Sequence, residues 1–412
     1  MNLNDLEGKL LDCVRCAACR EVCPTYVVLG KETATPRGRI ALMLAEHRSE
    51  IPLDAEFQLH MDLCTGCRAC EAACPSGVQY GTLIEHARAK VREARPRSVV
   101  GGLVEKVALR WLIPSRPRLR LAARMLRLQQ RPALRRALQA VLPRKLAAVE
   151  ALAPEFPPVR AGDVMPEPVV GPVKASVHFF AGCVASVALP GVDDATVKVL
   201  ARSGCQVSVP GAQTCCGALH AHQGDLEFAK ELARRNIDAF DGTDLIINNS
   251  GGCGAMLKEY GQLLADDPAY AEKAKAFVHR VRDVTEFLDQ IGPPKPTREL
   301  NLTVAIQDSC HLGNVQKIKQ PPRRLLKGLP GVTVREPAEG EVCCGAAGIY
   351  NITQPEVSNA LLDRKVGHIL KTGATVLATA NPGCYMHLER GLKEHGVRVA
   401  HVVELLEEAT RP

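Results

Sequence analysis

Short apolar runs alternate with longer amphipathic stretches over the second half of the chain. Apolar runs of strand length occur at 176–183, 244–248, 303–310 and 374–379. Between them, over 225–240 and 355–370, apolar residues recur at helical spacing. Strands that alternate with helices predict parallel sheets built from β-α-β units.

This half of the chain also repeats itself. In each repeat an apolar strand runs into a cysteine, and a Cys-Cys-Gly triplet follows 32 or 33 residues later. A helix, a second apolar strand and a Gly-Cys pair complete the pattern. The cysteines that recur in this way are Cys183, Cys215, Cys216 and Cys253, and then Cys310, Cys343, Cys344 and Cys384. A repeat of this length predicts two similar α/β domains packed together, with cysteines at the strand ends where α/β folds place their sites.

The first 94 residues hold a different cysteine pattern. Two runs of the form Cys-x2-Cys-x2-Cys-x3-Cys-Pro begin at Cys13 and Cys64, which is the spacing of bacterial two-cluster ferredoxins. Three closely spaced thiolates wrap one cubane, and the fourth reaches the other. We therefore assign one [4Fe–4S] cluster to Cys13, Cys16, Cys19 and Cys74, and the other to Cys64, Cys67, Cys70 and Cys23. Zinc would favour pairs of Cys-x2-Cys instead.

Together these patterns predict a multidomain α+β protein. We expect a helical ferredoxin-type domain with two [4Fe–4S] clusters at 1–94 and a basic helical linker at 95–172. Two cysteine-rich α/β domains follow at 173–292 and 297–412. Proline-rich stretches around 153–172 and 292–296 mark the connections. The helix expected at 37–48, between the two cysteine motifs, is read as cover for the clusters or as a docking face.

The cysteines of the repeats leave several chemistries open. Adjacent thiolates bracket a metal or cluster well, so a further iron–sulfur centre, a zinc site and a redox-active dithiol are all compatible with the pattern. Buried inert cysteines are the alternative, and Cys205, which has no counterpart in the second repeat, is read as such a core or surface thiol. Four histidines stand near the repeated cysteines and could ligate or tune a centre: His220, His222, His311 and His387.

The chain has 412 residues and 17 cysteines, an odd number. Its first residues, MNLNDLEGKL, lack the apolar core of a secretory signal, and the sequence has no long uncharged apolar run. We therefore expect a reducing, cytoplasmic environment and metal or redox chemistry.

The net charge of +7 is concentrated in one segment. Residues 95–149 contain 14 Lys and Arg against a single acid, Glu105, together with the only tryptophan, Trp111. Apolar residues recur three and four apart there, as in an amphipathic helix. Peripheral contact with an anionic membrane, docking of a partner subunit, and a helical hairpin that covers the clusters remain open. Nucleic-acid binding is not expected, because aromatic residues are only 4% of the chain.

Over essentially its whole length the sequence resembles the iron–sulfur subunit of bacterial glycolate oxidase (glycolate dehydrogenase). The resemblance is carried by both Cys-Pro motifs, by the stretch CPSGVQYG at 74–81 and by both Cys-Cys-Gly repeats. It extends to the cysteine-rich subunit of heterodisulfide reductase, to the iron–sulfur subunit of anaerobic glycerol-3-phosphate dehydrogenase and to lactate-utilisation proteins. Met256 and His387 stand where that superfamily often has one more cysteine, so a five-cysteine cluster is not carried over.

The resemblance implies an electron-transfer subunit. FAD-binding partner subunits would oxidise glycolate, and this chain would pass single electrons toward membrane quinone. No G-x-G-x-x-G motif indicates a dinucleotide site of its own. D-lactate or glycerol 3-phosphate as the substrate of the same module, a thiol–disulfide reductase acting at the Cys-Cys pairs, and a structural or metal-sensing scaffold are the rival hypotheses.

Overall fold

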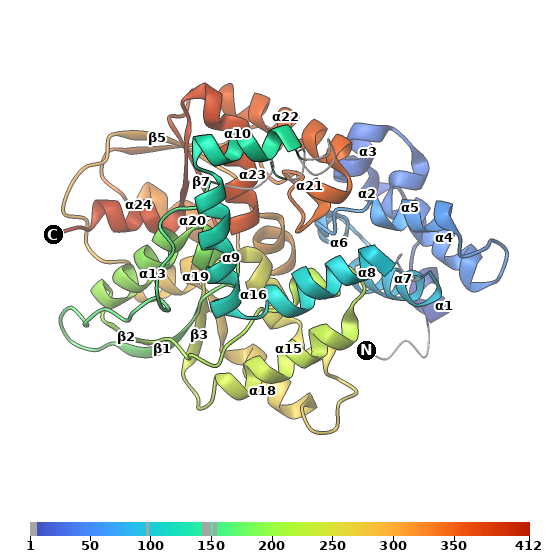
Figure 1. Ribbon diagram of the computed structural model, residues 1–412, viewed down its shortest axis with the longest axis horizontal. Helices are drawn as coiled ribbons and strands as arrows, with labels where there is room; N and C mark the ends of the chain where they lie inside the picture. The colour runs from blue at the N-terminus through green and yellow to red at the C-terminus, as the bar shows by residue number, and fades with distance from the viewer. Residues whose placement is uncertain (1–5, 96–98, 142–149, 151–154) are drawn as a thin grey trace.

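The computed structural model describes the chain apart from residues 1–5, 96–98, 142–149 and 151–154 (Figure 1). At the N-terminal end, short helices surround the first eight cysteines. They are α1 (Leu6–Leu11), α2 (Ala18–Glu21), α3 (Pro24–Leu29), η1 (Glu32–Ala34), α4 (Pro36–His47), α5 (Ala55–Asp62), α6 (Ala69–Ala72) and α7 (Tyr80–Ala94). Helix α4 begins at Pro36, after Thr35 caps its first turn by accepting from the Gly38 amide.

The two cysteine loops of this region share one backbone shape. In the first loop Arg15 and Ala17 have φ of 58° and 70°, and in the second Gly66 and Arg68 have 65° and 57°. These residues occupy equivalent places between the cysteines. A left-handed conformation at non-glycine residues costs roughly 1 kcal/mol or more each. Both loops therefore take the same tight curl around their cysteines, with two strained positions in the first loop and one, Arg68, in the second, where Gly66 adopts the conformation freely.

Helices of the basic segment follow α7. They are α8 (Val99–Glu105), the π-helix η2 (Lys106–Leu112), α9 (Arg116–Gln129) and α10 (Pro132–Val141). In Figure 1 they run from the N-terminal domain across the face of the molecule. Within the described part of the chain no helix is long and apolar enough to cross a membrane.

The first cysteine-rich region holds a four-stranded parallel sheet in the order β2-β1-β3-β4. Its strands are β1 (Ala175–Phe180), β2 (Cys205–Ser208), β3 (Leu245–Asn248) and β4 (Val281–Asp283). Its helices are α12 (Ala185–Ala188), α13 (Pro190–Arg202), α14 (Ala218–Ala221), α15 (Leu226–Ala239), α16 (Gly251–Lys258), α17 (Tyr260–Leu263), α18 (Ala271–Arg280) and α19 (Val284–Ile291).

The second region repeats this design, with a parallel sheet in the order β6-β5-β7-β8. Its strands are β5 (Leu302–Ile306), β6 (Val332–Arg335), β7 (Val376–Thr379) and β8 (Arg398–His401). Its helices are η3 (His311–Val315), α20 (Gln320–Lys327), α21 (Tyr350–Thr353), α22 (Pro355–Leu370), α23 (Pro382–Leu392), η4 (Lys393–His395) and α24 (Val402–Ala409). The predicted parallel sheets are thus present in both repeats.

The two repeats pack through equivalent helices. Helix α13 of the first contacts α24 of the second, and α20 of the second contacts α19 of the first. Ion pairs accompany both contacts, from Arg202 to Glu407 and from Arg324 to Asp289. One continuous apolar core extends across both sheets, from Phe179 and Leu200 to Leu377 and Leu406. The pair of repeats therefore folds as one packed body.

The sequence pattern identified only half of the strands. The four runs predicted from it became β1, β3, β5 and β7, the inner strands of the two sheets. The edge strands β2, β4, β6 and β8 were missed, because polar residues such as Gln206, Arg282 and Arg335 interrupt their short apolar pattern. Cys253 and Cys384 lie in the first turns of α16 and α23, directly after β3 and β7.

Candidate functional site: a series of four cysteine sets

The structure brings Cys23 together with the second cysteine motif. Burial raises the pKa of Cys67 and of Cys70, and negative charge on Cys23 and Cys64 raises both pKa values further. These four thiols therefore lie close to one another. Burial raises the pKa of Cys19, and negative charge on Cys13 and Cys23 raises it further. Cys16 is exposed and Cys13, Cys19 and Cys74 are half-buried, whereas Cys23, Cys64, Cys67 and Cys70 are buried. The set assigned to the first cluster therefore faces the surface, and the second lies inside.

Cys64 sits in surroundings that favour a thiolate. Burial raises the pKa of this thiol, but the charges of Arg39 and Arg88, the Gly66 amide and the Tyr80 hydroxyl lower it further than burial raises it. The Gly66 amide donates to Sγ at 3.4 Å and the Tyr80 hydroxyl at 3.7 Å. Iron binds the deprotonated sulfur, so this donor set fits a cluster ligand.

Two buried arginines hold the backbone around this set. Arg39, which is completely buried, donates to the carbonyl oxygens of His60 (2.7 Å) and Ala34 (2.8 Å). Arg88 donates to the carbonyl oxygens of Met61 and Cys64. Both satisfy backbone acceptors while they place positive charge beside an anionic site. The helix expected at 37–48 thus carries a residue of the site, and nothing in the sequence pattern separated Arg39 from its solvated neighbours.

In the first repeat the thiols of Cys183, Cys215, Cys216 and Cys253 interact in series. Interaction with Cys215 and burial raise the pKa of Cys183, and interaction with Cys183 and Cys216 lowers that of Cys215. Asn236 and Tyr260, both fully buried, fix the Cys-Cys backbone from behind. Asn236 donates to the Cys215 carbonyl (3.0 Å), and the Tyr260 hydroxyl donates to the Cys216 carbonyl (2.8 Å).

In the second repeat Cys310, Cys343, Cys344 and Cys384 form the equivalent series, and interaction between neighbouring thiols again shifts their pKa values. The glycine after the pair has φ near 90° in both repeats. At Gly345 a Cβ would stand 2.6 Å from the Ser358 carbonyl oxygen, so glycine is required there. The Gly217 and Gly345 amides donate to the sulfur of Cys215 and Cys343 at 3.5 and 3.4 Å.

The two repeats differ in the charge of a buried residue behind the pair. Gly217 packs on Ala229, and Gly345 packs on Ser358, so Ala229 and Ser358 are equivalent positions. Seven residues further along each helix, Asn236 of the first repeat therefore corresponds to Lys365 of the second. Lys365 is 2% exposed and donates to the Gly340 carbonyl oxygen at 3.1 Å. Burial lowers its pKa, and negative charge at Cys344, Cys343 and Cys384 raises it. The second set therefore has a buried amine where the first has an amide.

The inner ferredoxin set adjoins the second repeat. Cys67 packs against Cys343 and Cys310 in one small buried cluster. Asn314 in η3 donates to the Cys67 carbonyl oxygen at 3.1 Å, and the Tyr350 hydroxyl donates to the Leu63 carbonyl oxygen at 2.9 Å. These contacts fix the second repeat directly onto the loop that carries Cys64 and Cys67.

One asparagine connects the cysteine sets of the two repeats. The Asn381 side chain donates to Cys384 Sγ at 3.5 Å, and its oxygen accepts from the Gly252 amide at 2.9 Å, one residue before Cys253. The Ala380 carbonyl accepts from the Gly251 amide at 3.0 Å. The four sets therefore follow one another through the molecule: surface ferredoxin set, inner ferredoxin set, second repeat, first repeat.

The four predicted histidines lie around this series. His220 is buried against Asp225 (3.2 Å), and His222 contacts Glu85 (2.8 Å). The rings of His222 and His311 are 5.2 Å apart, and His311 Nδ1 lies 3.5 Å from Cys310 Sγ. His387 Nε2 lies 3.3 Å from the Ser358 hydroxyl. Burial lowers the pKa of His311 to about 3 and that of His387 to about 4, so both are neutral.

Cys205 is fully buried in β2 within the large apolar core, away from the cysteine series. Burial raises its pKa to about 11. It is the core thiol that the sequence indicated. Among the described residues, no three His, Cys, Asp or Glu side chains are arranged to hold a single metal ion.

The described residues of the basic segment pack on the first cysteine-rich region, and the hairpin that covers the clusters stays a prediction. Ile113 and Leu119 contact the core around Cys183 and Cys215. Arg116, 5% exposed, donates to the Ala181 carbonyl oxygen at 3.0 Å, and Arg110 pairs with Asp225 at 2.6 Å. The inward side of these helices is thus partly arginine, because these cations find buried oxygen partners.

Apolar side chains of the same helices face outward. They are between 40% and 66% exposed: Leu103, Val107, Trp111, Leu121, Met125, Leu126, Leu128 and Leu134. The Arg118 guanidinium stacks over the Trp111 ring at 4.5 Å. A surface of this kind is unusual for a monomer in water and marks contact with another body. Below it is called the apolar helical surface.

A dicluster ferredoxin domain joined to two cysteine-rich domains defines a class of iron–sulfur protein, and family models match this architecture. The 4Fe-4S dicluster domain matches residues 9–78, and the cysteine-rich domain matches twice, at 177–258 and 304–389. The crystal structure of a hypothetical protein from Helicobacter pylori shares the fold alone. The two proteins are 9% identical in sequence with a TM-score of 0.53, and the alignment covers 100% of this chain and 76% of that one.

Curated relatives narrow the class to one family. The probable glycolate oxidase iron-sulfur subunit of Bacillus subtilis is 41% identical over 98% of this chain and 94% of its own length. The glycolate oxidase iron-sulfur subunit of Escherichia coli is 33% identical over 98% and 95%. Lactate utilization protein A of Shouchella clausii is 32% identical over 56% of this chain and 98% of its own length. The chain belongs to the family of glycolate oxidase iron–sulfur subunits.

Proposed function

We propose that this chain is the electron-transfer subunit of a glycolate-oxidising enzyme. FAD-binding partner subunits convert glycolate to glyoxylate, which releases two electrons and two protons, and the chain carries the electrons singly toward quinone. The observation that carries the proposal is the packing of Cys67 against Cys310 and Cys343, which makes the cysteine sets one continuous series. The curated names of the full-length relatives support glycolate.

The residues that would hold the clusters are the two sets assigned from sequence: Cys13, Cys16, Cys19 and Cys74, and Cys64, Cys67, Cys70 and Cys23. A bound [4Fe–4S] cluster accepts and releases one electron at a time, at a potential set by hydrogen bonds, charge and burial. The chain supplies those influences through the Gly66 amide, the Tyr80 hydroxyl and the Arg39 and Arg88 charges. The cysteine-rich sets would hold a further iron–sulfur or zinc centre or act as redox thiols.

Entry of electrons is best placed at the outer ferredoxin set. Cys16 is exposed and its neighbours Cys13 and Cys19 are half-buried, whereas the sets of both repeats are largely covered. Electron transfer between proteins needs a redox centre close to the surface that docks, since the protein sets distance and access. The flavoprotein would therefore dock around 13–19.

Lactate is the second candidate substrate. Relatives named lactate utilization protein A align with about half of this chain and nearly all of their own length. That alignment concerns a shared module, whereas the glycolate oxidase relatives match from end to end.

We also infer a cytoplasmic protein that binds the inner face of the membrane through the apolar helical surface. Its apolar side chains are flanked by the exposed cations Arg118, Arg124, Arg127 and Arg131. Apolar side chains beside cations match an interface with anionic headgroups.

The test is anaerobic isolation of the native complex, followed by separate addition of glycolate, D-lactate and glycerol 3-phosphate while the iron–sulfur absorbance is followed. Bleaching by glycolate, with a co-purifying flavin, is the expected result. Bleaching by D-lactate or glycerol 3-phosphate instead would move the substrate to that candidate. Clusters that dithionite reduces but none of the three substrates bleaches would contradict the proposed donor.

A further inference from the structure

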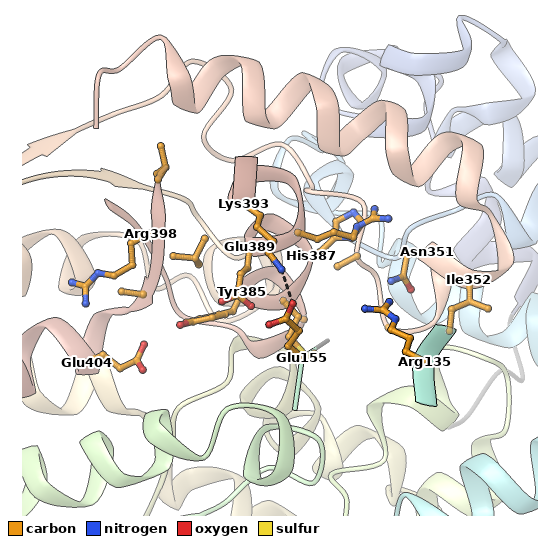
Figure 2. Close-up of a pocket in the computed structure, with 18 residues that line it drawn as sticks. Arg135, Glu155, Asn351, Ile352, Tyr385, His387, Glu389, Lys393, Arg398 and Glu404 are labelled. Atoms are coloured by element: carbon orange, nitrogen blue, oxygen red, sulfur yellow. Dashed lines mark hydrogen bonds and ion pairs between the residues drawn. The ribbon is translucent and has the colours of Figure 1, made fainter. Parts of the chain in front are cut away.

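A large cavity adjoins the cysteine set of the second repeat. It measures about 970 Å³ (Figure 2). Its wall includes Ala346, two residues after Cys344, and Gly383, directly before Cys384. The wall of the cavity is therefore formed in part by residues next to the buried thiols of Cys344 and Cys384. None of the function described above uses this space.

The cavity is amphiphilic. Tyr385, Met386 and Ile352 supply apolar surface, and Ile352 is 45% exposed. Arg390 and Arg398 add positive charge. The volume lies at the upper end of the range for organic ligands and far exceeds what a two-carbon acid would fill. An apolar molecule with polar oxygen acceptors fits this lining better than a small anion does.

One buried polar group in this wall lacks a partner. His387 is 4% exposed, and its Nδ1 has no hydrogen-bond partner in the structure although Nε2 contacts Ser358. Such an atom costs free energy unless a ligand or water pairs with it. Figure 2 shows the imidazole among the cavity residues, between Glu389 and Asn351.

Three carboxyl groups line the same space, those of Glu155, Glu389 and Glu404, and Glu155 pairs with Lys393. Burial raises the pKa of Glu404 to about 7 and also raises that of Glu389. Near neutral pH Glu404 is partly protonated. The cavity therefore holds groups that can give protons to a bound molecule.

The cavity also borders the apolar helical surface. Arg135 on α10 forms part of its wall, across from Arg390 on α23. The same helix carries the exposed Leu134, and α9 before it carries Met125 and Leu128. A lipid-soluble molecule that left a membrane at these helices would meet the cavity at its edge.

We propose that this cavity binds a lipid-soluble quinone and is where electrons leave the chain. The inference rests on the proposed electron-transfer function and adds the acceptor's site to it. The reaction balances as quinone plus two electrons plus two protons giving quinol. The electrons derive from hydroxy-acid oxidation at the flavoprotein, and the protons come through Glu404 and Glu389 from water. Tyr385 and Ile352 supply apolar contacts at opposite ends of the cavity, and Arg390 and His387 line its wall.

The test uses the full chain, purified anaerobically with its clusters. A photoreactive azidoquinone is crosslinked to it and the labelled peptides are mapped. Separately, protein reduced by dithionite is mixed with decylubiquinone, and the return of iron–sulfur absorbance gives the reoxidation rate. The variant is Ile352→Glu, and Leu59→Glu, an equally exposed leucine on α5, is its matched control.

We expect label in peptides covering 346–352 or 383–399, and a loss of labelling and of reoxidation rate of about tenfold in Ile352→Glu, because a carboxylate would replace the apolar contact at this end of the cavity. Iron content and reduction by dithionite should match Leu59→Glu. Label confined to other peptides, or equal reoxidation in both variants, would overturn the proposal. A different outcome is a reoxidation rate that falls in Ile352→Glu while glycolate fails to bleach the native complex. That outcome would support the quinone site and reject glycolate as the substrate.

Discussion

The side-chain amide of Asn314 donates a hydrogen bond to the backbone carbonyl oxygen of Cys67, 247 residues away in the chain, at 3.1 Å. This bond joins a π-helix of the second repeat to the loop expected to wrap the inner cluster. Both partners are buried, so the bond has no water to replace it.

Replacement of Asn314 by leucine should loosen this junction. The Cys67 carbonyl would lose its partner at a cost of about 1–3 kcal/mol, while the branching of the side chain stays the same. Hydrogen exchange of the amides at 63–70 should become faster than in wild type, with the two sheets unchanged. Unchanged exchange there would mean that the bond does not hold the domains together.

Replacement of Cys16 by serine should remove about one of the two [4Fe–4S] clusters and leave the other. The cysteine belongs to the surface set alone, and the inner set keeps its four thiols. Iron analysis and electron paramagnetic resonance of the reduced protein measure the loss. Cys205→Ser is the control, because that thiol lies in the apolar core and should leave iron content intact. Equal iron in Cys16→Ser and wild type would reject the ligand assignment.

Lys365→Met should lower the reduction potential of the iron–sulfur centre or redox dithiol that we propose for the second repeat. The buried amine places positive charge near Cys344 and Cys343, and methionine keeps the length but not the charge. A change of about 60 mV corresponds to a tenfold change in a one-electron equilibrium. A redox titration followed by spectroscopy checks this, with Asn236→Gln in the first repeat as the neutral counterpart. An unshifted potential would show that the amine is structural only.

Stability should fall in mildly acidic solution because of His401. Burial lowers the pKa of this residue to about 4, and its Nε2 lies 2.9 Å from the Asn249 carbonyl oxygen. The unfolded chain binds its proton near pH 6.5 and the folded chain only near pH 4. The contribution is complete above pH 6.5 and is lost as the pH falls toward 4, by about 1.4 kcal/mol per unit.

His401→Asn should reduce that dependence. Asparagine keeps a cap acceptor for the Val403 amide but has no titration in this range. Urea midpoints at pH 7.5 and pH 5.5 should differ less in the variant than in wild type. Parallel behaviour of both proteins would show that other groups dominate the acid sensitivity.

Charge on the apolar helical surface should weaken membrane binding. Met125→Glu and Leu128→Glu together should reduce co-sedimentation with vesicles rich in phosphatidylglycerol by about tenfold, through lost apolar burial and repulsion from the headgroups. Met165→Glu, at a more exposed methionine outside these helices, is the control. Binding that survives the double substitution, or that is absent from wild type, would count against the membrane surface.

The sequence predicted the cysteine chemistry of this molecule better than the contacts between residues far apart in the chain. Spacing alone identified the dicluster motif, the duplicated cysteine-rich domains and the inner strands, because each depends on residues close together in the chain. The domain boundaries at 94 and 95, 172 and 173, and 292 and 297 stay predictions, although the matched family segments fall inside them.

Long-range partners could not be read in the same way. Asn314, Asn381 and Arg88 act through hydrogen bonds to backbone groups far away in sequence, and no local pattern marks such a residue. The orientation of the basic helices was also hidden. Periodicity reveals that one side is apolar, but whether that side faces the protein depends on oxygen partners such as the Ala181 carbonyl, which only the fold supplies.

The reciprocal pairing of α13 with α24 and of α20 with α19 has the geometry of an association between two copies of one unit. Contacts that are exchanged between two equivalent units are the mark of an isologous two-fold dimer. A single repeat could have formed that dimer before the genes were joined, and the connection at 292–297 made the association intramolecular and independent of concentration. Because the two halves are held together covalently, equivalent positions can carry different residues in the two repeats, as Lys365 and Asn236 do.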